Sequence, residues 1–188
     1  MGGEWERALG MLVQMRRGGL NPDIINFSAA ISACVGGGYW SVALALLQDA
    51  RGSGLAVDAR GYNAAMSACE RAGEWEHALG LLSRMQQQAI SPDDVSCNIA
   101  INSWAAGGQW DAALSMMVHM QERLLRVDDI SHVDVISACT DAEQWEHALL
   151  VFAEMQEGRR NRIHFNAAAY ACEVGMQWER ALSILEGM

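Results

Sequence analysis

The side chains that could perform catalysis are scattered along this sequence and form no known catalytic motif. Its histidines and serines show no Ser/His/Asp order, and the chain contains neither a GxxxxGK phosphate loop nor a His-Glu-x-x-His helix. His77 and His147 occupy equivalent places in two similar segments, WEHALG and WEHALL. We expect both to lie on a solvated outer surface. The sequence therefore predicts a protein that is not an enzyme.

The five cysteines could support metal binding or disulfide formation. Cys34, Cys69, Cys139 and Cys172 recur at nearly constant spacing on apolar faces, and Cys97 is the fifth. No Cys-x-x-Cys pair of the kind common in zinc sites occurs. Helices stacked about 10 Å apart would also keep these cysteines from forming one cluster. We interpret them as small buried residues, and we expect no metal, cofactor or small-molecule substrate.

Short polar side chains leave hydrogen-bond recognition as the remaining chemistry. An asparagine amide offers both a donor and an acceptor, a serine hydroxyl is a short version of the same, and an aspartate accepts or orients its neighbour. The same residue types also cap helices and form turns. Residue type alone therefore leaves both interpretations open, and the elements that hold these side chains must decide.

Those elements are repeats. Trp5, Trp40, Trp75, Trp110 and Trp145 recur at a step of 35 residues, each followed by an Ala-Leu pair. Trp178 follows after a shorter step of 33 residues. A fixed period in this range indicates a stacked array of supersecondary units. We expect the tryptophan and methionine stripes to form core between the helices.

Each unit contains two amphipathic helices. In residues 59–93, apolar side chains recur at helical spacing before and after a break at Ala72 and Gly73. Helices of about 12 residues are marginal alone, so neighbouring units must bury one continuous core. In the unit 129–161, Glu143 replaces the turn glycine and the final linker is two residues short, so we expect an irregular connection to the next unit. The predicted divisions are a partial repeat 1–23, repeats 24–58, 59–93 and 94–128, a degenerate repeat 129–161, and an incomplete terminal repeat 162–188.

The repeat resembles the pentatricopeptide repeat over nearly all of the chain. In the unit 59–93 the resemblance rests on YN (62–63), MSAC (66–69), AG (72–73), Met85 and PD (92–93). It implies an all-α fold, a right-handed α-solenoid of stacked helix-turn-helix repeats. Both ends of the chain would expose faces that a further repeat normally covers, so we expect a piece of a longer array.

The resemblance also implies single-stranded RNA as the partner, with one base contacted per repeat. The fifth and last residues of each repeat would read the bases: Ser28, Asp58, Asn63, Asp93, Asn98, Asp128, Val133, Asn161 and Asn166. Second residues would sandwich the bases: Ile25, Arg60, Val95, Ile130 and Ile163. Arg71 would contact phosphate.

The family's pairing rules predict a short RNA element. Ser28 with Asp58 would prefer guanine, whereas Asn63 with Asp93 and Asn98 with Asp128 would each prefer uracil. Val133 cannot form a hydrogen bond through its side chain and would read little. The predicted core is therefore 5′-GUU, followed by an unread base and then a pyrimidine at Asn166.

The charge balance favours a second interpretation. The chain has 13 arginines, no lysine and 23 acidic residues, which give a net charge of −10. Nucleic-acid-binding proteins are expected to present a basic stripe. A helical-repeat scaffold that binds a protein partner in its groove is thus the alternative, and a protein effector could accompany RNA. No membrane span is expected, since no apolar run reaches about 18 residues. The resemblance implies a mitochondrion or chloroplast, although no targeting segment is evident.

Overall fold

The computed structural model describes residues 3–155 and 157–186, which contain α-helices, one short 3₁₀ helix and no strand. The chain divides into two compact units, Met1–Ile99 and Ala100–Met188. The helix α6, Asp94–Ala106, begins in the first unit and ends in the second. Each unit is described by itself below.

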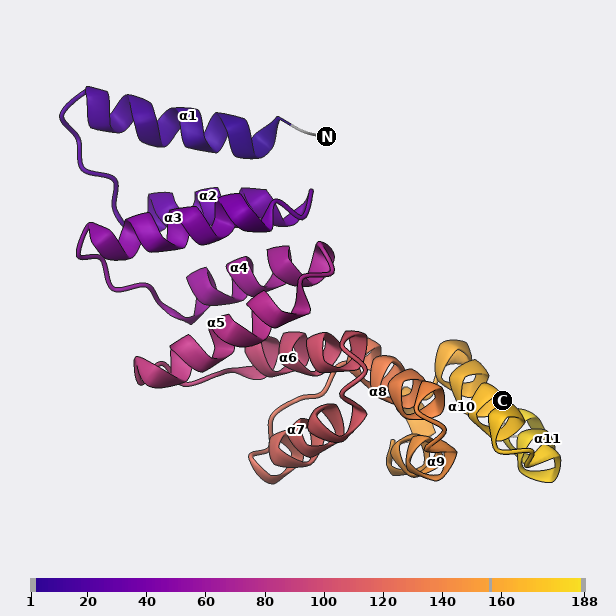
Figure 1. Ribbon diagram of the computed structural model, residues 1–188. Helices are drawn as coiled ribbons and strands as arrows, with labels where there is room; N and C mark the ends of the chain where they lie inside the picture. Colours follow the sequence, from indigo (N-terminus) through magenta and orange to yellow (C-terminus); the bar gives the residue numbers. More distant parts are fainter. Residues whose placement is uncertain (1–2, 156, 187–188) are drawn as a thin grey trace. The chain divides into compact units, whose positions relative to one another are not determined.

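The first unit is a stack of consecutive helices (Figure 1). Its single leading helix and its two helix pairs are α1 (Glu4–Arg17), α2 (Ile24–Val35), α3 (Trp40–Gly52), α4 (Ala59–Arg71) and α5 (Trp75–Gln87). Each pair packs internally, and α2 also packs on α1 and α4. The first helix α2 therefore contacts its counterpart α4 in the next repeat.

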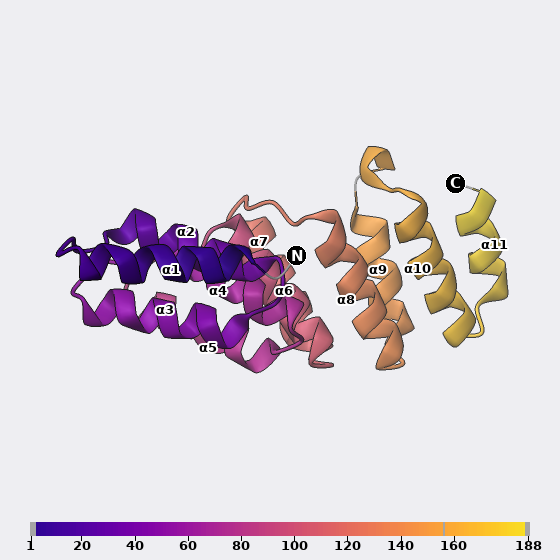
Figure 2. The same ribbon diagram turned by 90° about the horizontal axis from the view of Figure 1, so that it is seen from above.

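The second unit continues the same pattern with one local change. Its helices after α6 are α7 (Trp110–Glu122), α8 (Asp129–Asp141), α9 (Trp145–Glu154), η1 (Glu157–Arg159), α10 (Arg162–Val174) and α11 (Trp178–Glu186). Helix α10 packs on α8, α9 and α11, and Figure 2 shows α8 to α11 as a row. The second helix α9 has 10 residues, whereas α3, α5 and α7 each have 13.

Caps and turns decide where these helices begin and end. Asp23, Asp58 and Asp128 each precede a first helix, and the side chain of each accepts a hydrogen bond from a backbone N–H of the first turn. The turns between paired helices place Gly38, Gly73 and Gly108 at positive φ, a backbone region that glycine enters without steric cost. The predicted pair of helices in each complete repeat is confirmed, and so is the break at Ala72 and Gly73.

The turn at Glu143 is regular, whereas the irregular connection lies at the far end of α9. Glu143 has φ of 60°, close to the values at Gly73 and Gly108, so the glutamate adopts the glycine conformation. After α9, Met155 is extended, with φ of −64° and ψ of 135°, and η1 follows. The predicted irregular connection to the next unit is thus confirmed, and it lies at the shortened linker rather than at the Glu143 turn.

We expect Glu143→Gly to stabilise the chain by about 0.5–1 kcal/mol, because the left-handed strain of a residue with a Cβ exceeds the added entropy of an unfolded glycine. Equilibrium urea unfolding measures the change. Glu146→Gly, in the first turn of α9, is the matched control and should lose about 1 kcal/mol. Equal losses in both variants would contradict the left-handed turn.

The core is made of small and aliphatic side chains. Ala43, Ala65, Cys69, Leu47 and Met85 are almost fully buried, as are their counterparts in the second unit. The tryptophans are not fully buried: Trp5 to Trp145 are intermediate, and Trp178 is 66% exposed. The expectation of a tryptophan core is therefore wrong. The indoles of Trp5, Trp40, Trp110 and Trp145 instead contact a residue of the following repeat.

The two equivalent histidines are stacked on tryptophans. The His77 ring lies 4.5 Å from the Trp40 ring, and the His147 ring lies 5.3 Å from the Trp110 ring, measured between centroids. Trp5 meets Tyr39 at 5.0 Å, and Arg180 lies over Trp145 at 5.6 Å. The predicted solvated surface is therefore confirmed for His77, which is exposed, and wrong for His147, which is half-buried. Both rings also contact the tryptophan of the preceding repeat.

Candidate functional site

The last residue of each repeat is the N-cap of the first helix in the next repeat. Asp58 Oδ1 accepts from the Gly61 N–H at 3.1 Å, Asp93 Oδ1 from the Ser96 N–H at 2.9 Å, and Asp128 Oδ1 from the Ser131 N–H at 2.7 Å. Asn161 does the same for α10, with His164 completing a capping box. The capping interpretation is therefore confirmed for this position, and capping leaves other carboxylate lone pairs for further contacts.

One predicted reader pair is joined directly. Asn63 Nδ2 donates to both carboxylate oxygens of Asp93, at 2.9 and 3.1 Å. Asn63 Oδ1 lies 2.7 Å from the Ser96 hydroxyl, which is also 2.7 Å from Asp93 Oδ1. Asn63 is only 8% exposed. The single proton of the Ser96 hydroxyl is shared between Asn63 Oδ1 and Asp93 Oδ1, and with the Asp93 carboxylate on Nδ2 the amide orientation is fixed by two neighbours.

Hydrogen bonding also fixes the charge of Asp93. Burial alone would raise the pKa of its carboxyl, but bonds from the Ser96 N–H, the Ser96 hydroxyl and the Asn63 amide outweigh burial and lower it. The carboxylate is therefore charged at neutral pH. A charged acceptor holds an amide donor more strongly than a neutral one does.

The other predicted readers have different surroundings. Ser28 is half-buried beside Gly61, where an added Cβ would lie 3.8 Å from both Ser28 Oγ and Asp58 Oδ1. Asn98 is buried in the first unit, and Asp128 caps α8 in the second. Val133 is half-buried and Asn166 is exposed. In the first unit, the structure therefore places Ser28 near Asp58 and bonds Asn63 to Asp93.

Second residues of the first helices form exposed apolar positions. Ile25 is 72% exposed, Val95 52%, Ile130 65% and Ile163 60%, and Arg60 is exposed as well. The residues two positions further on, such as Phe27 and Tyr62, are fully buried. The second residue of each first helix is therefore an exposed β-branched side chain, or in one case an exposed guanidinium.

Arg71, the predicted phosphate contact, is exposed in the last turn of α4. Equivalent positions in the other repeats hold Gly36, Ala106, Asp141 and Val174. Four of the five repeats thus bring no cation to this place. Any phosphate contact there rests on one arginine.

Ser96 is the residue of this site that sequence reasoning missed. It occupies the third position of α6, where the capping rule expects a partner for the N-cap. Its counterparts differ: Ser131 Oγ donates to Asn102 Oδ1 at 2.8 Å, and Gly61 has no side chain. The aspartate three residues earlier was the available signal, although it could not show that the hydroxyl also reaches Asn63.

Metal and thiol chemistry find little support. Within residues 3–155 and 157–186, no group of three His, Cys, Asp or Glu side chains could hold a metal ion. The cysteines are buried and form no disulfide within the described residues. Burial raises the pKa of Cys69 and Cys139 to about 11, with the charge of Glu74 adding to the rise at Cys69. Such thiols are structural. No helix in the described part of the chain is long and apolar enough to cross a membrane.

Sequence comparison identifies the repeat independently of the structure. The PPR repeat family profile matches residues 57–105, and a PPR repeat profile matches residues 95–123 and 131–159. None of the curated proteins compared with the sequence matches it.

Several solved structures are similar to this chain. The pentatricopeptide repeat protein PPR10 from maize has 26% identity and a TM-score of 0.68, over 100% of this chain and 27% of that one. PPR10 bound to an 18-nt psaJ RNA element has 22% identity and a TM-score of 0.68, over 93% and 26% of the two chains. The PPR domain of Arabidopsis thaliana protein-only RNase P 1, in complex with tRNA, has 13% identity and a TM-score of 0.74, over 95% and 91%.

This chain therefore spans about a quarter of the length of the maize protein. The likeness confirms the predicted fold class, an all-α solenoid of stacked helix-turn-helix repeats.

Proposed function

Because this chain belongs to the pentatricopeptide repeat family, we propose that it binds single-stranded RNA along the fifth and last residues of its repeats. It acts as an adaptor in RNA processing, stabilisation or translation. It either occludes the bound RNA or recruits other proteins to it, and it catalyses no reaction itself. Two of the similar structures support this proposal, since PPR10 was solved with an RNA element and the RNase P domain with tRNA.

The observation that carries the proposal is the fixed amide of Asn63. Its Nδ2 is held by Asp93 and its Oδ1 by Ser96, so the group is preorganised. Arg60 and Val95 are exposed in the first turns of the same and the following first helix. A base beside the amide would find hydrogen-bonding groups at its edge and side chains suited to contact its faces.

We propose an order of bases from the fifth and last residues of successive repeats. Ser28 with Asp58 takes guanine, while Asn63 with Asp93 and Asn98 with Asp128 take uracil. Val133 contributes no hydrogen bond, so the base at the repeat 129–161 stays unread. Asn166 takes a pyrimidine next. Three specified bases at about 1–3 kcal/mol each support weak binding only.

Fluorescence anisotropy with labelled oligonucleotides tests this function. We expect an RNA containing 5′-GUU to bind about tenfold or more tightly than a scrambled RNA of equal composition. Binding should weaken with salt, but with a shallow slope, because only Arg71 sits at the phosphate position. Asn63→Thr should move the preference at the middle base from uracil towards guanine.

Two results would overturn the proposal. One is equal binding of the two RNAs; the other is an unchanged base preference in Asn63→Thr that retains its helix content. If neither RNA binds and a basic peptide does, the protein-binding scaffold becomes the better interpretation. Its acidic net charge of −10 is the observation that favours such a partner. The mitochondrial or chloroplast address stays a prediction.

A further inference from the structure

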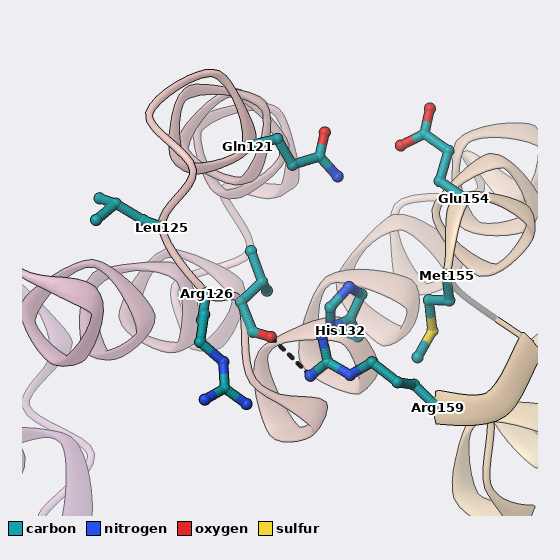
Figure 3. Close-up of a pocket in the computed structure, with 8 residues that line it drawn as sticks. Gln121, Leu125, Arg126, His132, Glu154, Met155 and Arg159 are labelled. Carbon is teal, nitrogen blue, oxygen red and sulfur yellow. Dashed lines mark hydrogen bonds between the residues drawn. The ribbon is translucent and has the colours of Figure 1, made fainter.

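A cavity of about 230 Å³ lies in the second unit, and none of the predicted readers lines it, although Asp128 and Val133 adjoin lining residues in the chain. It opens between the end of α7, the start of α8 and the end of α9, and Figure 3 shows the residues that line it. A cavity needs only about 10–15 Å³ of such space to hold one water molecule. This one can therefore accept a ligand of several heavy atoms.

The cavity exists because the repeat departs from its own pattern here. The fourth residue of the first helix is a buried aromatic in three repeats, Phe27, Tyr62 and Phe165. The Tyr62 hydroxyl reaches the Gln88 side chain at 2.9 Å, towards the end of the second helix. In the repeat 129–161 this residue is His132, whose ring is shorter than that of a tyrosine. The space that an aromatic side chain would occupy is left open.

Two guanidinium groups reach the cavity. Arg159, beyond the shortened helix α9, donates from Nη2 to the Val127 carbonyl at 3.0 Å and to Asp129 Oδ1 at 3.2 Å. Both bonds use one nitrogen, and no bond from its Nε or Nη1 to another described residue is present. Figure 3 shows the Arg126 and Arg159 guanidiniums at the same end of the cavity as the His132 ring.

The opposite end of the cavity is polar without being basic. Figure 3 shows the Gln121 amide and the Glu154 carboxylate at this end, away from the arginines. A carboxylate accepts hydrogen bonds from hydroxyl groups. The two ends therefore suit a ligand with an oxyanion at one end and hydroxyl groups at the other.

His132 adds a switchable donor. Its Nδ1 lies 2.7 Å from the Asp128 carbonyl, so this nitrogen carries the proton and Nε2 is the one that titrates. Burial lowers the pKa of His132, and the charges of Arg159 and His164 add to the fall, against the Asp128 bond and the charge of Asp129. A bound anion would oppose this fall and favour the protonated ring.

We propose that this cavity binds a phosphate monoester, with the phosphate between Arg126, Arg159 and His132 and with hydroxyl groups of the ester near Gln121 and Glu154. Guanidinium forks match the geometry of phosphate oxygens and bind them by paired hydrogen bonds. A free sugar phosphate and the terminal phosphate of an RNA share this chemistry. The free ligand tests the site independently of the proposed RNA reading.

Isothermal titration of the whole chain with ribose 5-phosphate is the direct test. We expect one saturable site that weakens about tenfold or more in Arg126→Ala and in Arg159→Ala. His132→Phe introduces the aromatic side chain found in three other repeats, so it should fill the cavity and abolish binding while the thermal midpoint stays level or rises. Arg123→Ala, an exposed arginine at the end of α7 that does not line the cavity, is the matched control.

Two further arms identify the source of the phosphate and the part played by His132. If RNA ends supply the ligand, a 5′-phosphorylated oligonucleotide should outbind its 5′-hydroxyl form, and Arg126→Ala should erase the difference. If free sugar phosphates supply it, the two oligonucleotides should bind alike while ribose 5-phosphate still binds. Sulfate, which stays dianionic, should bind more tightly from about pH 8 to about pH 6 as His132 gains a proton among Asp128, Asp129, Glu154, His164 and the arginines.

The proposal fails if ribose 5-phosphate shows no saturation up to about 10 mM. It also fails if binding survives unchanged in folded His132→Phe or in the double variant of Arg126 and Arg159. A sulfate affinity that is flat with pH would remove His132 from the site.

Discussion

Asp93→Ala is expected to lower the free energy of unfolding by about 2–4 kcal/mol, through two losses that add. The first is the N-cap of α6, worth about 1 kcal/mol. The second is the acceptor of the buried Asn63 amide, whose unsatisfied donor costs about 1–3 kcal/mol when no replacement partner forms. Urea unfolding followed by circular dichroism measures the sum.

Asp58→Ala separates these two losses. Asp58 also caps its helix, with Oδ1 accepting from the Gly61 N–H at 3.1 Å, but Gly61 replaces Ser96 in that repeat. The fifth residue there is Ser28, which has no amide to be left without an acceptor. We therefore expect Asp58→Ala to lose only about 1 kcal/mol. Equal losses from the two variants would show that the Asn63–Asp93 bonds contribute nothing to stability.

The pH dependence of stability is a second test of the contact between Asn63 and Asp93. The pKa of Asp93 is lowered from its ordinary value of 3.8, chiefly by Ser96 and Asn63 against the effect of burial. A lowered pKa stabilises the fold above 3.8, and that stabilisation is lost as the pH falls from 3.8 through the folded-state value. As the pH falls below about 4, the free energy of unfolding should therefore decrease less for Asp93→Asn than for the parent chain.

The sequence predicts best what is decided within one repeat. The helix pairs follow from apolar spacing, and their ends follow from aspartate caps and turn glycines, because each depends on residues a few positions apart. Glu143 shows the limit of this reasoning. The chain geometry of the turn imposes a left-handed residue whether or not glycine is present, and so the turn stayed regular.

Contacts between repeats could not be predicted from the sequence. The rings of His77 and His147 were expected in solvent because their own helices are amphipathic with those residues outward. The tryptophan they contact belongs to the preceding repeat, and a pattern read along one helix does not contain that neighbour. The same applies to Ser96, whose hydroxyl lies against Asn63 of the previous repeat.

The candidate site also has features that could be predicted from the sequence and features that could not. The resemblance to a known family named Asn63 and Asp93, and residue chemistry explained why an amide and a carboxylate suit recognition. The actual pairing, with Nδ2 on the carboxylate and Oδ1 on a serine, needed coordinates because it depends on how closely two first helices approach. The cavity at His132 was not predicted at all, since it arises from a smaller side chain and a shortened linker acting together.

Gly175→Ala is expected to destabilise the chain by about 1–3 kcal/mol, because its Cβ has no space. That atom would lie 2.5 Å from Cδ2 and 2.6 Å from Cγ of Trp145, in the preceding repeat. The φ of Gly175 is −75°, so alanine meets no backbone strain and the effect is purely steric. Arg180, over the Trp145 ring at 5.6 Å, further limits where the indole can move.

Gly80→Ala is the matched control for this change. Gly80 lies inside α5, and an added Cβ would meet nothing within 4 Å. Alanine there should stabilise the helix by about 1 kcal/mol. Opposite signs from the two substitutions, measured by urea unfolding, would show that Trp145 packs on the backbone of the next repeat. A stabilised Gly175→Ala would instead mean that the indole leaves this surface without loss, so that the tryptophans do not join successive repeats.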